Sequence, residues 1–223
     1  MTLSNLRCSL AVSLTCLLVA GTVGAQSRKR TAAGAGDFSY YMLVLSYAPN
    51  FCDQPGGSKS AQECGVGRRL GFVVHGLWPQ GDTTRGPEKC GPASPVAQSL
   101  VQTMLNYFPT ASLIQHEWAT HGTCSGLSTA DYFAAVRKAR DSVTIPADLN
   151  QPSQKLTLSP SEIEAKVSAA NPSFPKAAFR TSCYRNAELE EVRVCLTTGL
   201  APRVCGSSAG ECTTPTLTML PVR

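Results

Sequence analysis

The chain has 223 residues, of which 43% are hydrophobic and 16% are charged, so it has room for one domain with a substantial core. Its formal net charge of +5 comes from 20 Lys and Arg against 15 Asp and Glu, which suits an anionic partner but does not identify one. Beyond the N-terminal segment no stretch is apolar enough to cross a bilayer, so we expect a soluble mature protein.

The first 25 residues have the pattern of a secretory signal peptide. Arg7 precedes an apolar run from about Cys8 to Ala20, and small residues lead up to Ala25. The run is too short to span a membrane, which argues against the alternative of a membrane anchor. We therefore expect export, to the periplasm or the outside, with a flexible leader over 26–36 and one domain over 37–223.

The first half of the domain is predicted to contain two strands and a helix. Residues 38–49 are rich in aromatic and branched side chains and read as a buried strand. A second strand is expected over 71–75, ended by Gly76 and Pro79. A loop follows over 80–95, and residues 96–108 have the 3.6-residue apolar rhythm of a helix.

The second half is predicted to contain three more helices and then two strands. The helices are expected over 114–121, from 128 or 129 to 142, and over 159–171, the last with a capping box formed by Ser159 and Glu162. Alternating apolar residues indicate strands over 177–185 and 188–198. This order favours an α+β fold: a single domain with a largely antiparallel sheet flanked by helices.

Eight cysteines remain after the signal peptide. An even number in an exported protein argues for disulfides, so we expect a disulfide-stapled domain. Structural zinc is the alternative, but the closely spaced pairs lack the C-x-x-C pattern that it prefers. The eight residues are Cys52, Cys64, Cys90, Cys124, Cys183, Cys195, Cys205 and Cys212.

All three histidines lie in two unusual strings, "GFVVHGLWPQ" and "HEWATHGTC". If 114–121 is helical, successive residues turn by about 100°, so His116, Glu117, Thr120 and His121 share one sector. Two imidazoles can act as one neutral base and one cationic acid, and a carboxylate can orient or charge them. His75, at the end of a strand, would supply the opposite side of a cleft.

Other site types fit this pattern less well. His116 and His121 are five residues apart, which is not the H-E-x-x-H spacing of a metalloprotease. A zinc site built from the three histidines and Glu117 stays open as an alternative. There is no G-x-S-x-G elbow and no phosphate-binding glycine loop, so no nucleotide cofactor is expected.

The strings "FVVHGLWPQ" and "HEWATHGTCSG" resemble the two active-site segments of the ribonuclease T2 family, in the same order. "YYMLVLSYAPNFC" is similar to the first core strand of that family and its following cysteine. The resemblance covers most of 38–212.

The resemblance implies an endoribonuclease that acts on single-stranded RNA with low base specificity. The ribose 2′-hydroxyl would attack phosphorus and form a 2′,3′-cyclic phosphate, without metal or cofactor, so DNA would be inert. His121 would be the general base, His75 the general acid and His116 a phosphate ligand. Glu117 would stabilise the transition state, with Trp78 and Tyr47 at the substrate. We expect a monomer.

The resemblance also implies four disulfides: Cys52–Cys64, Cys90–Cys124, Cys183–Cys212 and Cys195–Cys205. One departure concerns Thr120, because the family commonly has lysine just before the last histidine of this motif. A lysine would offer positive charge to developing oxyanions, so its loss bears on rate. A catalytically idle RNA-binding or protein-binding module on the same fold is the alternative function.

Overall fold

The computed structural model describes residues 36–55 and 61–222, and residues 32–223 form one compact unit. The expected signal peptide, 1–25, and nearly all of the leader, 26–36, lie outside the described residues. In the described part of the chain, none of the helices is both long and apolar enough to cross a membrane.

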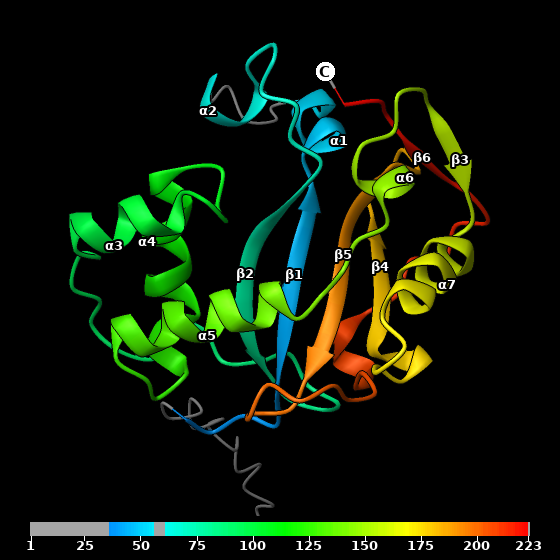
Figure 1. Cartoon of the computed structure of the whole chain (residues 1–223). Helices are drawn as coiled ribbons and strands as arrows, with labels where there is room; N and C mark the ends of the chain where they lie inside the picture. Colours follow the sequence, from blue (N-terminus) through cyan, green and yellow to red (C-terminus); the bar gives the residue numbers. More distant parts are fainter. Residues whose placement is uncertain (1–35, 56–60, 223) are drawn as a thin grey trace, which may run out of the picture. The chain divides into compact units, whose positions relative to one another are not determined.

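The centre of the unit is an antiparallel sheet with the strand order β2-β1-β5-β4 (Figure 1). A separate ribbon pairs β3 with β6. The expected α+β class with a largely antiparallel sheet is therefore confirmed. The strands are β1 (Tyr40–Tyr47), β2 (Phe72–Gln80), β3 (Leu156–Leu158), β4 (Phe179–Cys183), β5 (Leu189–Leu196) and β6 (Leu217–Met219).

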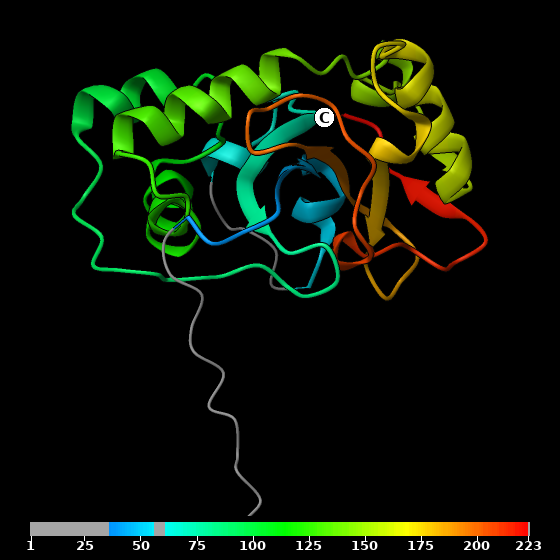
Figure 2. The ribbon, with the colours of Figure 1, turned by 90° about the horizontal axis from the view of Figure 1, so that it is seen from below.

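The longer helices lie beside the sheet, with α5 and α7 on the same side of it (Figure 2). The short helices α1, α2 and α6 and the strands β3 and β6 were not expected from the sequence. Pro49, taken as the end of a strand, instead lies in the first turn of α1. The helices are α1 (Ala48–Asp53), α2 (Ala61–Cys64), α3 (Gln98–Met104), α4 (Ala111–Thr120), α5 (Thr129–Asp141), α6 (Ala147–Asn150) and α7 (Pro160–Ala170).

Strand alternation gives the sheet two buried faces. Leu43 and Leu45 of β1 pack in the main core, which also contains side chains of α3, α4, α5 and α7. Met42 and Val44 point to the other face, into a smaller cluster with Cys195 and Cys205. Strand β1 is therefore buried on both sides, and it serves as a rigid reference for its neighbours.

Strand β2 does not end at Gly76 and Pro79, as the sequence indicated, but runs on to Gln80. It is an edge strand, so the missing N–H of Pro79 costs no ladder hydrogen bond. A β-bulge interrupts its pairing with β1: Leu45 pairs with Val74 and Val44 with Gly76, which leaves His75 as the extra residue.

A second bulge lies on β5. Ser182 pairs with Glu191 and Cys183 with Leu189, so Glu190 is the extra residue. Both bulges thus carry an ionisable side chain. Bulges bend a strand and re-aim its side chains, and they are frequent next to active sites.

Four disulfides tie the unit together, in the pairs that the resemblance implies: Cys52–Cys64, Cys90–Cys124, Cys183–Cys212 and Cys195–Cys205. The bridge of Cys90 to Cys124 joins the long loop after β2 to the turn that follows α4. It therefore connects the segments that follow β2, which carries His75 and Trp78, and α4, which carries His116 and Glu117.

Candidate active site

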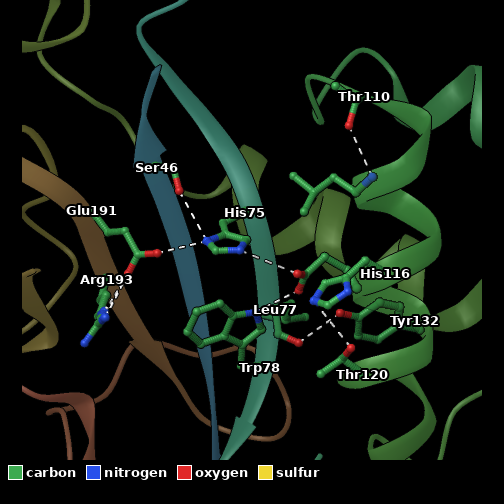
Figure 3. A network of polar contacts seen from close by, with 12 residues as sticks. Ser46, His75, Leu77, Trp78, Thr110, His116, Thr120, Tyr132, Glu191 and Arg193 are labelled. Atoms are coloured by element: carbon green, nitrogen blue, oxygen red, sulfur yellow. Dashed lines mark hydrogen bonds and ion pairs between the residues drawn. The ribbon is translucent and has the colours of Figure 1, made fainter. Parts of the chain in front are cut away.

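His75 is held from behind by two neighbouring strands. Its Nδ1 lies 2.9 Å from Oε1 of Glu191 on β5 and 3.3 Å from Oγ of Ser46 on β1 (Figure 3). Ser46 and Glu191 are paired in the sheet, so β2, β1 and β5 each contribute one side chain to this row. Because Nδ1 is engaged by Glu191 and Ser46, Nε2 is the ring nitrogen of His75 that remains for other contacts.

Glu191 is a site residue that the sequence did not reveal. Only 3% of it is exposed, and Arg193 holds its other carboxylate oxygen, with Nε at 2.9 Å and Nη2 at 2.8 Å. Burial raises the pKa of Glu191, but His75 and Arg193 outweigh burial and keep the pKa below its usual value. The carboxylate therefore stays charged behind His75.

The charge of Glu191 sets the protonation of His75. Burial lowers the pKa of His75, but the hydrogen bond to Glu191 and the charges of Glu191 and Glu117 outweigh burial, so the pKa is raised. His75 is thus biased toward the imidazolium form at neutral pH. An oriented imidazolium is a suitable proton donor.

Glu117 enters from α4, whose start is fixed by an N-cap bond from Leu113 N–H to Oγ1 of Thr110. The glutamate is fully buried, and its Oε2 accepts a hydrogen bond of 2.8 Å from Nε1 of Trp78. Gly76 permits this approach, because a Cβ there would lie 2.0 Å from Oε2 of Glu117. The strand and the helix meet at a residue without a side chain.

The other oxygen of Glu117 is not satisfied within the described residues. Oε1 is buried without a hydrogen-bond partner there and lies 3.7 Å from Nε2 of His75, beyond hydrogen-bond range. Burial raises the pKa of Glu117 to about 7, although the charge of His75 and the hydrogen bond from Trp78 oppose the shift. Near neutral pH, Glu117 is therefore present in both its protonated and its ionised form.

His121 immediately follows α4, and its ring is stacked on the indole of Trp78, with centroids 4.9 Å apart. Burial, then the charges of His75 and His116, lowers the pKa of His121 to about 3, so the ring is neutral. Its Nδ1 is buried and has no hydrogen-bond partner in the described part of the chain. A neutral, unengaged imidazole can accept a proton.

Trp78 contacts both imidazoles. Its ring meets that of His75 edge-on, with centroids 5.0 Å apart, and stacks on that of His121, with centroids 4.9 Å apart. His75 and Trp78 are three residues apart, which on a regular strand would put them on opposite faces. The bulge at His75 shifts the alternation by one residue and brings both side chains to the same face.

His116 is exposed, and its Nε2 lies 3.5 Å from Oγ1 of Thr120, one helical turn further on. Together with His75, it lines a cavity of about 620 Å³. Thr120 is 6% exposed, and its carbonyl accepts a hydrogen bond of 2.7 Å from the backbone N–H of Lys89. The loop after β2 therefore brings the backbone of Lys89 next to Thr120, the position where the resemblance noted above implies a lysine.

Tyr47 is not brought to the site. It is fully buried, its hydroxyl donates to the carbonyl of Leu220 at 2.6 Å, and its ring packs on Phe72. The structure thus gives the expected substrate contact of Tyr47 no support and assigns this aromatic to the core. The other expected residues, His75, Trp78, His116, Glu117 and His121, do meet where β2 faces α4.

This arrangement is suited to acid–base chemistry. An imidazole with a raised pKa and a neutral imidazole contact the same indole. A carboxyl group whose pKa is also raised lies beside the first of them. Among residues 36–55 and 61–222, no group of three or more His, Cys, Asp or Glu side chains could hold a metal ion.

Comparison with known proteins links this geometry to a family. The model of the ribonuclease T2 family matches residues 38–205. A ribonuclease of Aeromonas hydrophila is 38% identical over 117 residues, which are 52% of this chain and 51% of that protein. A probable ribonuclease of Haemophilus influenzae is 34% identical over 155 residues, which are 64% of this chain and 54% of that protein. The chain thus spans about half the length of these two relatives.

Solved structures show the same fold. The RNase-related protein from Calystegia sepium superposes with a TM-score of 0.65 at 20% identity, covering 83% of this chain and 98% of that one. Because the family match extends over most of the described unit and includes both histidine strings, we conclude that the chain belongs to the ribonuclease T2 family.

Proposed function

We propose that the protein is a metal-independent endoribonuclease that cleaves single-stranded RNA by transesterification. The observation that carries this proposal is the pair of imidazoles that both contact Trp78, His75 with a raised pKa and His121 neutral. An in-line displacement at phosphorus needs a base and an acid on opposite sides of the reacting atom, and this pair supplies both.

In the proposed reaction, His121 removes the proton of the ribose 2′-hydroxyl while the 2′-oxygen attacks the adjacent phosphorus. The bond from phosphorus to the 5′-oxygen breaks, and Nε2 of His75 gives its proton to the leaving oxygen. The products are a 2′,3′-cyclic phosphate end and a free 5′-hydroxyl end. The nucleophile belongs to the substrate, which is why DNA should be inert.

The transition state carries extra negative charge on the phosphoryl oxygens, and two groups are available to offset it. His116 is exposed on the same cavity as His75 and can bind the phosphate. Glu117 has a pKa of about 7 and an unsatisfied Oε1, so its protonated form can donate a hydrogen bond to an oxyanion. Donors that are fixed in advance are effective because they need no reorganisation during the reaction.

We also propose that the enzyme is exported and acts as a monomer without an absolute base requirement. Export rests on the sequence of 1–25 and is supported by four disulfides, which persist in oxidising compartments such as the periplasm or the extracellular space.

The decisive experiment incubates purified protein with single-stranded RNA in EDTA and identifies the product ends by mass spectrometry. We expect 2′,3′-cyclic phosphate ends, no cleavage of single-stranded DNA, and no loss of rate when EDTA is added. Tight RNA binding without cleavage would favour the idle binding module, and EDTA-sensitive cleavage would reject the metal-independent mechanism.

A further inference from the structure

A separate cavity, of about 300 Å³, lies where the loop before β2, the loop between α3 and α4 and the end of α5 meet. Val73 of β2 lines both this cavity and the one that contains His75 and His116, so the two are neighbours along one edge strand. A backbone hydrogen bond of 3.1 Å from the N–H of Val74 to the carbonyl of Tyr107 fixes the loop between α3 and α4 against that strand.

Two arginines line this cavity, which we call the arginine cavity. Arg68, in the loop before β2, is exposed, and its guanidinium has no hydrogen bond or ion pair with any of the described residues. At the end of α5, Nη1 of Arg140 donates to the carbonyl of Val143 at 2.8 Å. That bond uses only one of the N–H donors of the guanidinium. Both side chains therefore have donors left for an external acceptor.

One carboxylate also lines the arginine cavity. Oδ2 of Asp141 accepts a hydrogen bond of 3.0 Å from the hydroxyl of Tyr107. The pKa of Arg140 is lowered by burial, which the charge of Asp141 opposes without reversing it. An anion placed against a partly buried guanidinium favours its charged form. Since two arginines face one aspartate, the cavity keeps a positive balance and suits an anion.

The position of the arginine cavity indicates which anion it would receive. In the proposed function, His75 protonates the leaving 5′-oxygen, so RNA that continues past the leaving nucleoside lies on the side of His75. The next phosphate of the chain follows that nucleoside directly, and the arginine cavity adjoins the His75 cavity at Val73. Guanidinium groups match phosphate oxygens in geometry, and contacts with phosphates position a nucleic acid without reading its bases.

We propose that Arg68 and Arg140 form a subsite for the phosphate on the 3′ side of the leaving nucleoside, which makes the protein prefer RNA that extends beyond the cleaved bond. The proposal rests on the proposed function. It concerns the length of the RNA on one side of the cleaved bond and does not depend on the identity of any base.

The test compares UpA with UpAp, which carries one added phosphate on the 3′-hydroxyl of the leaving adenosine. We expect kcat/KM to be at least about threefold higher for UpAp at low salt, because partly exposed charge pairs each contribute modestly. The advantage should shrink as the salt concentration rises. In Arg68→Gln and in Arg140→Gln, the UpAp to UpA ratio should fall toward one.

Two controls isolate the subsite. Arg137→Gln removes the same charge from an exposed residue of α5 that does not line the arginine cavity, so the ratio should stay at its original value. The pair pUpA and UpA adds the phosphate at the opposite end of the substrate, and its ratio should not respond to any of these variants. Thermal unfolding verifies that each variant is folded. Arg68→Gln removes no hydrogen bond to the described residues, so it should fold as the unmodified protein does.

The outcomes are separable. Equal cleavage of UpAp and UpA by the unmodified protein overturns the inference, and so does a ratio that neither Arg68→Gln nor Arg140→Gln lowers. An equal fall of the ratio in Arg137→Gln also overturns it, because the preference would then reflect overall charge. In all three cases UpA is still cleaved, so the proposed function is untouched. Absence of cleavage of every RNA substrate would instead refute the proposed function.

Discussion

Nδ1 of His75 and Oε1 of Glu191 are joined across β1 by a contact of 2.9 Å, between an edge strand and a strand two places away in the sheet. The two side chains are in direct contact, and Arg193 in turn binds the carboxylate of Glu191. In the proposed reaction, Glu191 does not touch the substrate. It is a positioning residue that orients His75 and maintains its charge.

Glu191→Gln tests this role through the pH profile. Loss of the carboxylate removes the largest contribution that raises the pKa of His75, so the pKa should fall. The acid must be protonated to act, and its pKa sets the pH above which the rate declines. We therefore expect the alkaline limb of kcat/KM to move to lower pH.

The pKa of His75 can also be measured directly, because the chain has only three histidines to assign in an NMR titration. Glu188→Gln is the matched control on the same strand pair and should leave both the limb and the His75 titration unchanged. If the alkaline limb of Glu191→Gln coincides with that of the unmodified enzyme, Glu191 does not tune the acid.

A substrate with a good leaving group separates the acid from the base. His75→Ala and His121→Ala should each lower RNA cleavage by about 10²–10⁴. Uridine 3′-(p-nitrophenyl phosphate) releases a phenolate that needs no proton, so His75→Ala should cleave it at nearly the unmodified rate. His121→Ala should stay slow, because the 2′-hydroxyl still needs a base. Recovery of His121→Ala instead would reverse the two assignments.

Glu117→Gln should lower activity and raise stability at alkaline pH. The folded pKa of about 7 is higher than the usual value of 4.5 for a glutamate, so folding favours the protonated form. The stabilisation is complete below pH 4.5 and is lost as the pH rises through 7. A glutamine mimics the neutral form at every pH, so it should remove a penalty of about 3 kcal/mol at alkaline pH.

The measurement is the melting temperature of both proteins at pH 4 and pH 8. We expect the glutamine variant to melt higher than the unmodified protein at pH 8 and at a similar temperature at pH 4, while kcat/KM falls. An equal melting temperature at pH 8 would contradict the shifted pKa of Glu117.

The bridge between Cys90 and Cys124 should matter more to catalysis than the one between Cys52 and Cys64. Loop entropy gives about 4 kcal/mol for a separation of 34 residues and about 3 kcal/mol for 12. Only the first bridge joins the loop that contacts Thr120 to the end of α4.

Two double serine variants, one for each bridge, make the comparison, with urea unfolding for stability and initial rates for activity. Both should be less stable. The variant without Cys90 and Cys124 should also lose activity under conditions where it is fully folded. Equal activity of the two folded variants would show that the clamp does not position the helix.

Local sequence patterns predicted much of the fold, because helix caps and apolar periodicity depend only on residues that are close in the sequence. The capping box of Ser159 and Glu162 and the sector of α4 that carries His116 and Glu117 follow from spacing alone. The prediction that Gly76 and Pro79 end the strand was wrong for a physical reason. Both residues weaken strands in general, but here one allows the approach of Glu117, and the other lies on an edge strand.

The remaining features of the site depend on tertiary contacts. The segment "ELEEVRV" offers three glutamates, and only the pairing of β5 with β1 and the bulge on β5 decide which one meets His75. Likewise, an aromatic at Tyr47 reads equally well as a stacking platform or as core. Its partner, the carbonyl of Leu220, lies 173 residues away in the sequence.

The two bulges determine which kinds of genetic change this protein can tolerate. Each bulge consists of one surplus residue, so removing the codon just before His75 would restore regular pairing and turn His75 to the opposite side of the sheet, while Trp78 would keep its place opposite Met42. Exchanging an amino acid leaves that count intact. Natural variants of β2 and β5 should therefore differ in the identity of their amino acids but not in the length of the strands.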